Sequence, residues 1–162
     1  MSVPSSQDEL MAALNHLILH PTNNSPNRID TVILNAGIND FAMLTDQSDD
    51  LLEQMMLVNV AYPMQLIKRL LPIMIAQKKP AQIINIGSTF GSIGYPGFSA
   101  YSASKFALRG ATEALGREYS DTSIRFRYFA PRATKTTMKS PQALAVLAKC
   151  LLASMLIYHQ IL

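Results

Sequence analysis

The hydrophobic positions of the chain follow two alternating spacings, which predicts helices and short strands in turn. Short runs rich in β-branched and aromatic residues, bounded by turn residues, predict strands at 31–34, 82–86 and 123–129. Apolar residues three and four positions apart predict four helices: about 7–19, from Ser48 or Asp49 to about 77, about 100–119, and the apolar tail 143–162. We expect Pro63 to interrupt or restart the second of these helices.

This alternation predicts an α/β fold in a single domain that covers residues 1–162. Strands separated by helices of this length need crossover connections, so we expect a parallel sheet of about three strands. Helices should cover both faces of such a sheet. A chain of 162 residues is long enough to bury a sizeable core.

Composition narrows the possible partners. The formal net charge is +3, but only 15% of the residues are charged and the basic ones are scattered, so we expect no nucleic-acid partner. Cys150 is the single cysteine, which excludes an intramolecular disulfide and favours a cytoplasmic location. The segment 143–162 is long enough to span a bilayer, but it contains Lys149 and His159, so we expect no membrane insertion.

Residues that can carry chemistry lie just after the ends of the predicted strands. Ligands of open parallel sheets bind outside the carboxyl ends of the strands. The segments at these ends are Asn35–Gly37, Gly87–Ser88 and Pro131–Thr136. The next helix should place Tyr101 and Lys105 one turn apart, on the side that faces this crevice. We expect all these pieces to converge on one site.

Tyr101 and Lys105 suit proton transfer. An ammonium within about 4 to 6 Å of a phenol favours the phenolate and so lowers the pKa of the phenol. Tyr101 can then act as a general acid or base near neutral pH. The hydroxyl of Ser88 can hold a substrate oxygen beside it. Taken alone, Lys105 can equally be a solvated helix residue and Tyr101 a half-buried anchor.

Two other sequence motifs have spacings typical of binding sites, but we assign no site to either. Gly87, Gly91 and Gly94 have a spacing that suggests a phosphate loop, but they lead to a Tyr-Pro-Gly turn rather than directly into a helix. His16 and His20 share a predicted helix face at metal-ligand spacing, but no cysteine or carboxylate cluster completes a site. We therefore expect neither a phosphate cradle at these glycines nor a metal site.

The chain resembles the short-chain dehydrogenase/reductase family, whose members are NAD(P)-dependent oxidoreductases with a doubly wound, Rossmann-like sheet. The matching stretches cover about two-thirds of the chain in the order and spacing of the family. They are DTVILNAG at 30–37, LVNV at 57–60, IINIGSTFGSIGYPGFSAYSASKFAL at 83–108 and FAPRATKT at 129–136.

The resemblance implies a role for each matching residue. Tyr101 corresponds to the catalytic acid or base, and Ser88 to the residue that binds the substrate oxygen. Lys105 corresponds to the residue that lowers the tyrosine pKa and binds the nicotinamide ribose. Asn59 corresponds to the fourth catalytic member, whose backbone carbonyl holds a water in a proton relay; without the family, it can also simply bond within its own helix.

The resemblance also implies a set of cofactor contacts. Asn35, Ala36 and Gly37 correspond to the motif that steadies the sheet and lines the adenine-ribose side of NAD or NADP, although Asn35 can also be a simple turn residue. Pro131 and Thr136 correspond to the loop that touches the nicotinamide carboxamide. In the same loop, Arg132 stands where glycine is commoner in the family.

The chain departs from the family pattern at both ends. No glycine-rich turn precedes Asn35, and residues 1–29 correspond to the helix and loop before the fourth strand of the family. We therefore expect a truncated Rossmann-like domain that lacks the first three strands and, after Met138, the usual C-terminal region. The strand at 31–35 should then be a bare sheet edge.

Two readings of the function remain open at this point. One is an active oxidoreductase that transfers a hydride between NAD(P)(H) and a small carbonyl or alcohol. The other is an inactive family fragment that keeps the active-site residues without binding the cofactor productively. In the family, helices that match 54–77 and 100–119 form a dimer interface, so either reading allows a homo-oligomer.

Overall fold

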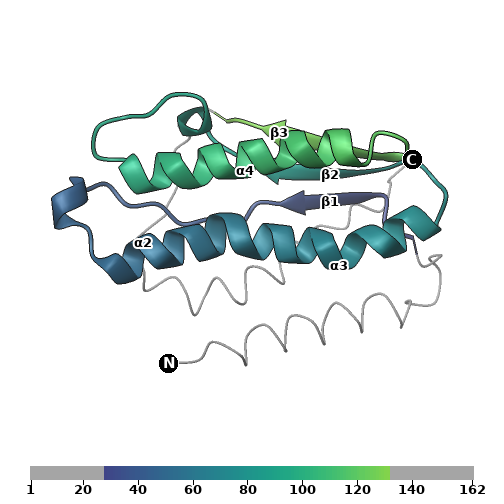
Figure 1. Cartoon of the computed structure of the whole chain (residues 1–162), viewed down its shortest axis with the longest axis horizontal. Coiled ribbons are helices and arrows are strands. Elements are labelled where there is room, and N and C mark those ends of the chain that lie inside the picture. Colours follow the sequence, from purple (N-terminus) through teal and green to yellow (C-terminus); the bar gives the residue numbers. More distant parts are fainter. Residues whose placement is uncertain (1–27, 132–162) are drawn as a thin grey trace.

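A computed structural model describes residues 28–131 of the 162-residue chain. The helix expected at 7–19 and the tail at 143–162 lie outside these residues. Figure 1 shows how strands and helices alternate along the described part. In chain order the elements are β1 (Thr31–Leu34), η1 (Leu44–Asp46), α2 (Asp49–Met56), η2 (Leu57–Ala61), α3 (Tyr62–Ala76), β2 (Ala81–Ile86), η3 (Thr89–Gly91), α4 (Ser99–Glu118) and β3 (Ile124–Phe129).

The strands form one parallel sheet in the order β1-β2-β3, which confirms the predicted α/β fold with three strands. Val32 of β1 is aligned with Ile83 of β2, and Ile83 is aligned with Phe126 of β3. The crossovers pass through α2 and α3 before β2, and through α4 before β3. Within residues 28–131, β1 is an edge strand, as the sequence predicts.

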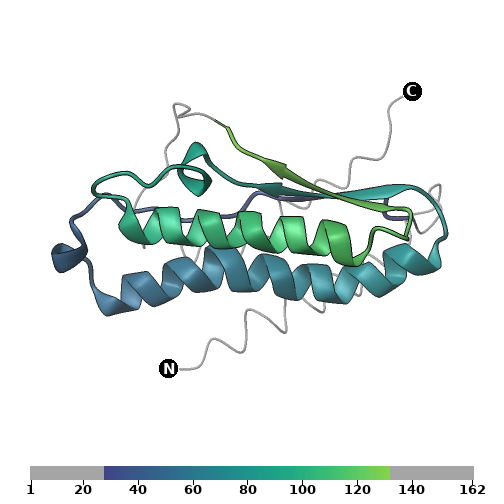
Figure 2. The same ribbon diagram turned by 45° about the horizontal axis from the view of Figure 1, so that its top comes forward.

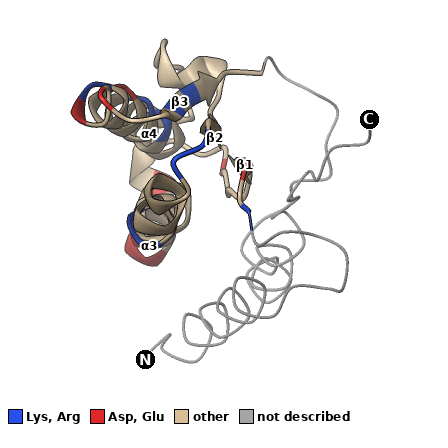
Figure 3. Cartoon of the chain, turned by 90° about the vertical axis from the view of Figure 1, so that its right-hand side faces the viewer, with Lys and Arg blue, Asp and Glu red and all other residues tan. Residues whose placement is uncertain are grey.

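Both long helices pack against the same face of the sheet. Figure 2 shows α3 and α4 side by side on one side of the strands, and the end-on view in Figure 3 agrees. Side chains alternate along a strand, and the buried set includes Val32, Ile83 and Ile124, which pack with Leu70 and Met74 of α3. The sequence predicts helices on both faces; within residues 28–131 the helices cover one.

The second predicted helix runs from α2 through η2 into α3, with a change of winding between them. Ser48 caps its start, because the serine Oγ accepts a hydrogen bond from the backbone N–H of Leu51 at 3.3 Å. Within η2 the winding is π-helical, and the N–H of Tyr62 bonds to the carbonyl of Leu57. Pro63 follows in the first turn of α3, where a missing N–H is tolerated. The helix therefore continues past Pro63, and the change of winding lies just before it.

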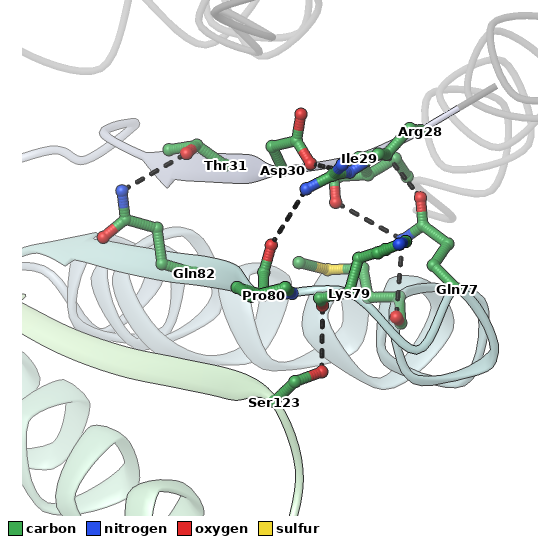
Figure 4. Close-up of polar contacts among 10 residues, drawn as sticks. Arg28, Ile29, Asp30, Thr31, Gln77, Lys79, Pro80, Gln82 and Ser123 are labelled. Atoms are coloured by element: carbon green, nitrogen blue, oxygen red, sulfur yellow. Dashed lines mark hydrogen bonds and ion pairs between the residues drawn. The ribbon is translucent and has the colours of Figure 1, made fainter. Parts of the chain in front are cut away.

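Side chains anchor the amino end of β1 to the end of α3 (Figure 4). Gln77 accepts a hydrogen bond from the N–H of Ile29 at 2.7 Å and donates one to its carbonyl at 3.3 Å. Arg28 donates to the carbonyl of Pro80 at 3.3 Å and forms an ion pair with Asp30. These contacts lie at the opposite end of the sheet from the predicted site, and they fix β1 against α3.

A mostly apolar groove of about 540 Å³ runs between α3 and the C-terminal end of α4. Its lining includes Met64, Ile67, Leu71, Ile75, Leu115 and Tyr119. Despite such apolar surface, none of the helices within residues 28–131 has the length and hydropathy needed to cross a membrane.

Candidate active site

The carboxyl ends of the parallel strands bring the predicted site segments to one edge of the sheet. Asn35–Gly37 follows β1, Gly87 and Ser88 follow β2, and Pro131 follows β3. Thr136 lies outside the described residues. This edge is where open parallel sheets bind their ligands.

Tyr101 and Lys105 lie one turn apart near the start of α4, and both are buried. The Nζ of Lys105 is 5.6 Å from the centre of the Tyr101 ring, over its face. The same nitrogen donates a hydrogen bond to the carbonyl of Ile86, the last residue of β2, at 3.1 Å. The helix thus holds a phenol and an amine together against the end of the central strand.

Burial governs the ionisation of both groups. It lowers the pKa of Lys105 to about 8, because removal from water disfavours the charged amine. It also raises the pKa of Tyr101, and hydrogen bonding by the Ser88 side chain opposes this rise. The lowered tyrosine pKa predicted from the sequence is therefore wrong for this structure. The Tyr101 side chain is buried, at 9% exposed, and the amine lies over its ring face.

Ser88 begins the turn that follows β2 and caps η3. Its Oγ accepts a hydrogen bond from the backbone N–H of Phe90 at 3.2 Å. Hydrogen bonding of Ser88 also lowers the pKa of Tyr101, against the larger effect of burial. Ser88 after β2, and Tyr101 and Lys105 on α4, thus lie at the same edge of the sheet.

Aromatic rings hold the Tyr101 ring in place. Phe90 and Phe98 approach it at centroid distances of 6.1 Å and 6.3 Å, both close to edge-on. Phe98 also packs against Phe41, which is 72% exposed, at 5.1 Å. The cluster thus extends from the buried tyrosine to the surface.

Asn59 of η2 is fully buried, and its side chain is occupied by three hydrogen bonds. Its Oδ1 accepts from the N–H of Ile38 at 2.8 Å, and its Nδ2 donates to the carbonyl of Ile38 at 2.8 Å and to Ser104 Oγ at 2.9 Å. Ser104 in turn donates to the carbonyl of Tyr101 at 2.7 Å. The α-helical partner of the Asn59 carbonyl is the N–H of residue 63, and Pro63 has none.

Gly37 lies beside both Asn59 and Lys105. A Cβ at this position would be 3.1 Å from the Oδ1 of Asn59 and 3.4 Å from the Nζ of Lys105. On the same turn Asn35 is exposed and Ala36 is partly buried. The turn after β1 therefore borders the amine, and the glycine keeps the space next to it open.

One residue at this site, Tyr128 of β3, is not predicted from the sequence. Its Oη accepts a hydrogen bond from the N–H of Ser88 at 3.2 Å. It also lies 3.3 Å from the carbonyl oxygens of Ser88 and Lys105, to which it can donate. The alternation of residues 123–129 places Tyr128 on the helix-facing side, which is the one signal that the sequence offers.

A parallel sheet with helices packed against it in this order defines an α/β, Rossmann-like class of fold. The family model described as short chain dehydrogenase matches residues 5–145. The chain therefore belongs to the short chain dehydrogenase family.

Individual relatives agree with this assignment. The short chain dehydrogenase adrF of Penicillium rubens is 33% identical over 134 residues, which are 82% of this chain and 52% of the relative. The solved structure of 4-hydroxyisoleucine dehydrogenase complexed with NADH matches with a TM-score of 0.72 at 28% identity, over 85% of this chain and 58% of that one.

A third match concerns the fold alone. Gluconate 5-dehydrogenase from Burkholderia cenocepacia, in complex with NADP and tartrate, has a TM-score of 0.73 at 24% identity. The match covers 86% of this chain and 51% of that one. The chain spans about half the length of the curated relatives that it matches.

Proposed function

We propose that this chain carries the catalytic centre of an oxidoreductase that transfers a hydride between NAD or NADP and a small carbonyl or alcohol. The convergence of Ser88, Tyr101 and Lys105 carries this proposal. A buried amine lies over the tyrosine ring, and hydrogen bonding by Ser88 opposes the rise that burial causes in the pKa of that tyrosine. Membership of the short chain dehydrogenase family supports the class of reaction.

In the reductive direction Tyr101 donates its proton to the carbonyl oxygen while the carbonyl carbon receives a hydride, so that C=O becomes CH–OH. Because burial raises its pKa, Tyr101 is protonated at neutral pH, which is the form that donates. Ser88 donates a hydrogen bond to the same substrate oxygen. Lys105, with a pKa of about 8, is mostly charged at neutral pH and stabilises the phenolate that remains.

The cofactor supplies the hydride in reduction and accepts it in oxidation. Gly37 suits its binding, because a side chain there would fill the space beside the Lys105 amine. We assign Lys105 to the nicotinamide ribose and the turn Asn35–Gly37 to the adenine-ribose side. Pro131 and Thr136 are assigned to the carboxamide.

We assign Asn59 to the proton relay through its backbone carbonyl. Its side chain is fully buried and bonded to Ile38 and Ser104, so it does not face a substrate. In an α-helix this carbonyl would bond to the N–H of residue 63, which proline lacks, and we assign a water to it. A water held there would connect the Lys105 amine to solvent.

The test is oxidation of NADH and NADPH by the purified chain against a panel of aldehydes and ketones, with Tyr101→Phe as the matched variant. We expect turnover in the parent chain and a loss of at least about 100-fold in the variant, the usual size of a general acid contribution. Turnover that survives Tyr101→Phe would refute the assigned role. Circular dichroism checks that the variant is folded.

An inactive family fragment is the second proposal, and the burial of Tyr101 favours it. Burial raises the pKa of the phenol, which makes it a weaker acid. A fluorescence titration with NADH and NADPH separates the two proposals. Micromolar binding of either nucleotide would contradict the inactive fragment, and no binding up to millimolar nucleotide would contradict the enzyme.

We also propose that the chain self-associates through the helices at 54–77 and 100–119. The groove between α3 and the end of α4 supports this, because an apolar surface of this kind gains free energy when a second copy covers it. Sedimentation of the parent chain and of Ile75→Glu, a change in the lining, tests the proposal. We expect a dimer that the substitution dissociates, whereas a parent chain that sediments as a monomer would contradict it.

A further inference from the structure

Tyr128 connects two elements that carry different parts of the proposed catalytic set. It lies near the end of β3, and its hydroxyl reaches the turn that carries Ser88 and the helix that carries Lys105. A phenol hydroxyl has one hydrogen to donate and can also accept. It accepts from the Ser88 N–H at 3.2 Å, and its own hydrogen serves the carbonyl of Ser88 or that of Lys105, each 3.3 Å away.

Two glycines make this reach possible. A Cβ on Gly87 would lie 2.0 Å from the Cζ of Tyr128, and a Cβ on Gly91 would lie 2.0 Å from its Oη. A side chain at either position would push the Tyr128 ring out of this place. The two glycines that suggest a phosphate loop in the sequence therefore accommodate an aromatic ring.

The turn that carries Ser88 is held in place by contacts with other elements. Ser88 lies two residues after Ile86, the last residue of β2, with Gly87 directly before it and Gly91 three residues after it. Its Oγ accepts from the Phe90 N–H at 3.2 Å within the same turn, a contact that fixes it relative to its own loop but not relative to α4. The Tyr128 hydroxyl ties the backbone of Ser88 to the backbone of the helix that carries Tyr101 and Lys105. Further along the same loop, Arg109 of that helix bonds to the Ser92 hydroxyl at 2.8 Å.

We propose that Tyr128 is a positioning residue, whose hydroxyl ties the Ser88 backbone to the Lys105 backbone and thereby sets the Ser88 hydroxyl against Tyr101. The inference rests on the proposed function and deepens it, because it assigns the geometry of the Ser88 and Tyr101 pair to a third side chain. Tyr128 itself touches neither substrate nor cofactor in this role. A ring that merely fills space would act through its packing and not through its hydroxyl.

The test is a double-mutant cycle read at Tyr101 itself. Tyr101 is replaced by 3-fluorotyrosine, whose phenol is more acidic than that of tyrosine, and its pKa is followed by ¹⁹F NMR. Ser88→Ala is made in the parent chain and in the Tyr128→Phe background. The cycle cancels the direct effect of the Tyr128 hydroxyl on the Tyr101 pKa, since that effect is common to both arms.

We expect Ser88→Ala to raise the pKa of residue 101 in the parent chain, and to shift it by less than half as much in the Tyr128→Phe background. A shift of equal size in both backgrounds would overturn the inference. Restoring a donor with 4-aminophenylalanine at position 128 should recover the larger shift. Tyr119→Phe, which removes a hydroxyl at the far end of α4, serves as the matched control and should leave the shift unchanged.

This readout separates the inference from the proposed function. A cycle that shows the coupling in a chain without turnover supports the role of Tyr128 and contradicts the enzyme. Turnover with no coupling supports the enzyme and contradicts the role of Tyr128. In an active chain, Tyr128→Phe should also lower kcat at least threefold while the KM for the nucleotide stays unchanged.

Discussion

The side chain of Asn59 bonds to both backbone groups of Ile38, accepting from its N–H and donating to its carbonyl at 2.8 Å each. This pair joins the π-helical turn η2 to the segment that follows β1. A third bond, to Ser104 at 2.9 Å, extends the connection to the helix of Tyr101 and Lys105. Three elements of the site are therefore held by one buried amide.

Replacing this amide should unfold the site first. We expect Asn59→Leu to lower the free energy of unfolding by about 2–4 kcal/mol, because it leaves the N–H and carbonyl of Ile38 buried and unpaired. Ser104→Ala, which removes one of the three partners, should cost only about 1 kcal/mol. Urea denaturation gives the free energy of unfolding of both variants. Equal losses of free energy in the two would contradict the expected ranking.

Lys105 should lower the free energy of unfolding at neutral pH. Its folded pKa of about 8 lies below its ordinary value of 10.5, so the unfolded state binds more protons between these pH values and stability rises with pH across that window. We expect Lys105→Met to be more stable than the parent by about 1–3 kcal/mol at pH 7, with the difference shrinking above pH 8. Denaturation at pH 7 and at about pH 9.5 tests this.

Lys79→Met is the control for that experiment, because Lys79 is exposed. It should change the free energy of unfolding by less than about 0.5 kcal/mol at either pH. A Lys105→Met chain that is less stable than the parent at pH 7 would show that the buried amine contributes stability, which is the opposite of the expected result.

The rate of carbonyl reduction should fall as the pH rises through about 8. Below this value Lys105 is charged and stabilises the phenolate of Tyr101 that forms, and above it the amine is neutral. Tyr101 itself stays protonated over this range, because burial raises its pKa. The pH dependence of kcat/KM in the parent chain measures this, and a rate that rises between pH 7 and 9 would contradict it.

Pro63→Ala should weaken catalysis without weakening the fold. The new N–H can bond to the Asn59 carbonyl as in an ordinary α-helix, which removes the proposed site for the relay water. We expect kcat to fall several-fold while the free energy of unfolding is unchanged or raised. Pro72→Ala, the same change further along α3, is the matched control and should leave kcat unchanged.

Gly37→Ala should weaken nucleotide binding. The new Cβ would lie 3.1 Å from the Oδ1 of Asn59 and 3.4 Å from the Nζ of Lys105, so it crowds the space that the ribose would use. We expect the Kd for the nucleotide to rise at least tenfold. Gly110→Ala in α4, where a Cβ meets nothing within 4 Å, should leave Kd unchanged and stabilise the helix by about 0.5–1 kcal/mol.

The sequence predicts the strands and helices well because they depend on local spacing. The strand predicted at 31–34 is found at Thr31–Leu34, and the helix predicted at 100–119 is found at Ser99–Glu118. The parallel order follows as well, since crossovers of that length allow little else. Pairing Tyr101 with Lys105 needs only the pitch of a helix.

Features that depend on contacts between residues far apart along the chain could not be predicted from the sequence. The direction of the Tyr101 pKa depends on how deeply the ring is buried among Phe90 and Phe98, which no local pattern reveals. Tyr128 reaches Ser88 across 40 positions of the chain, and its reach depends on the two glycines that face it. The π-helical turn before Pro63 depends on backbone bonds of the folded helix, such as that from the Tyr62 N–H to the Leu57 carbonyl, which no sequence pattern reveals.

The proposed function depends above all on proton exchange between Tyr101 and the substrate, assisted by Ser88 and Lys105. Reduction of a carbonyl panel by NADH or NADPH, compared between the parent chain and a folded Tyr101→Phe variant, tests this step. We expect turnover in the parent chain and almost none in the variant. Equal turnover in the two proteins, or none in the parent chain at saturating nucleotide, would contradict the proposed role of Tyr101.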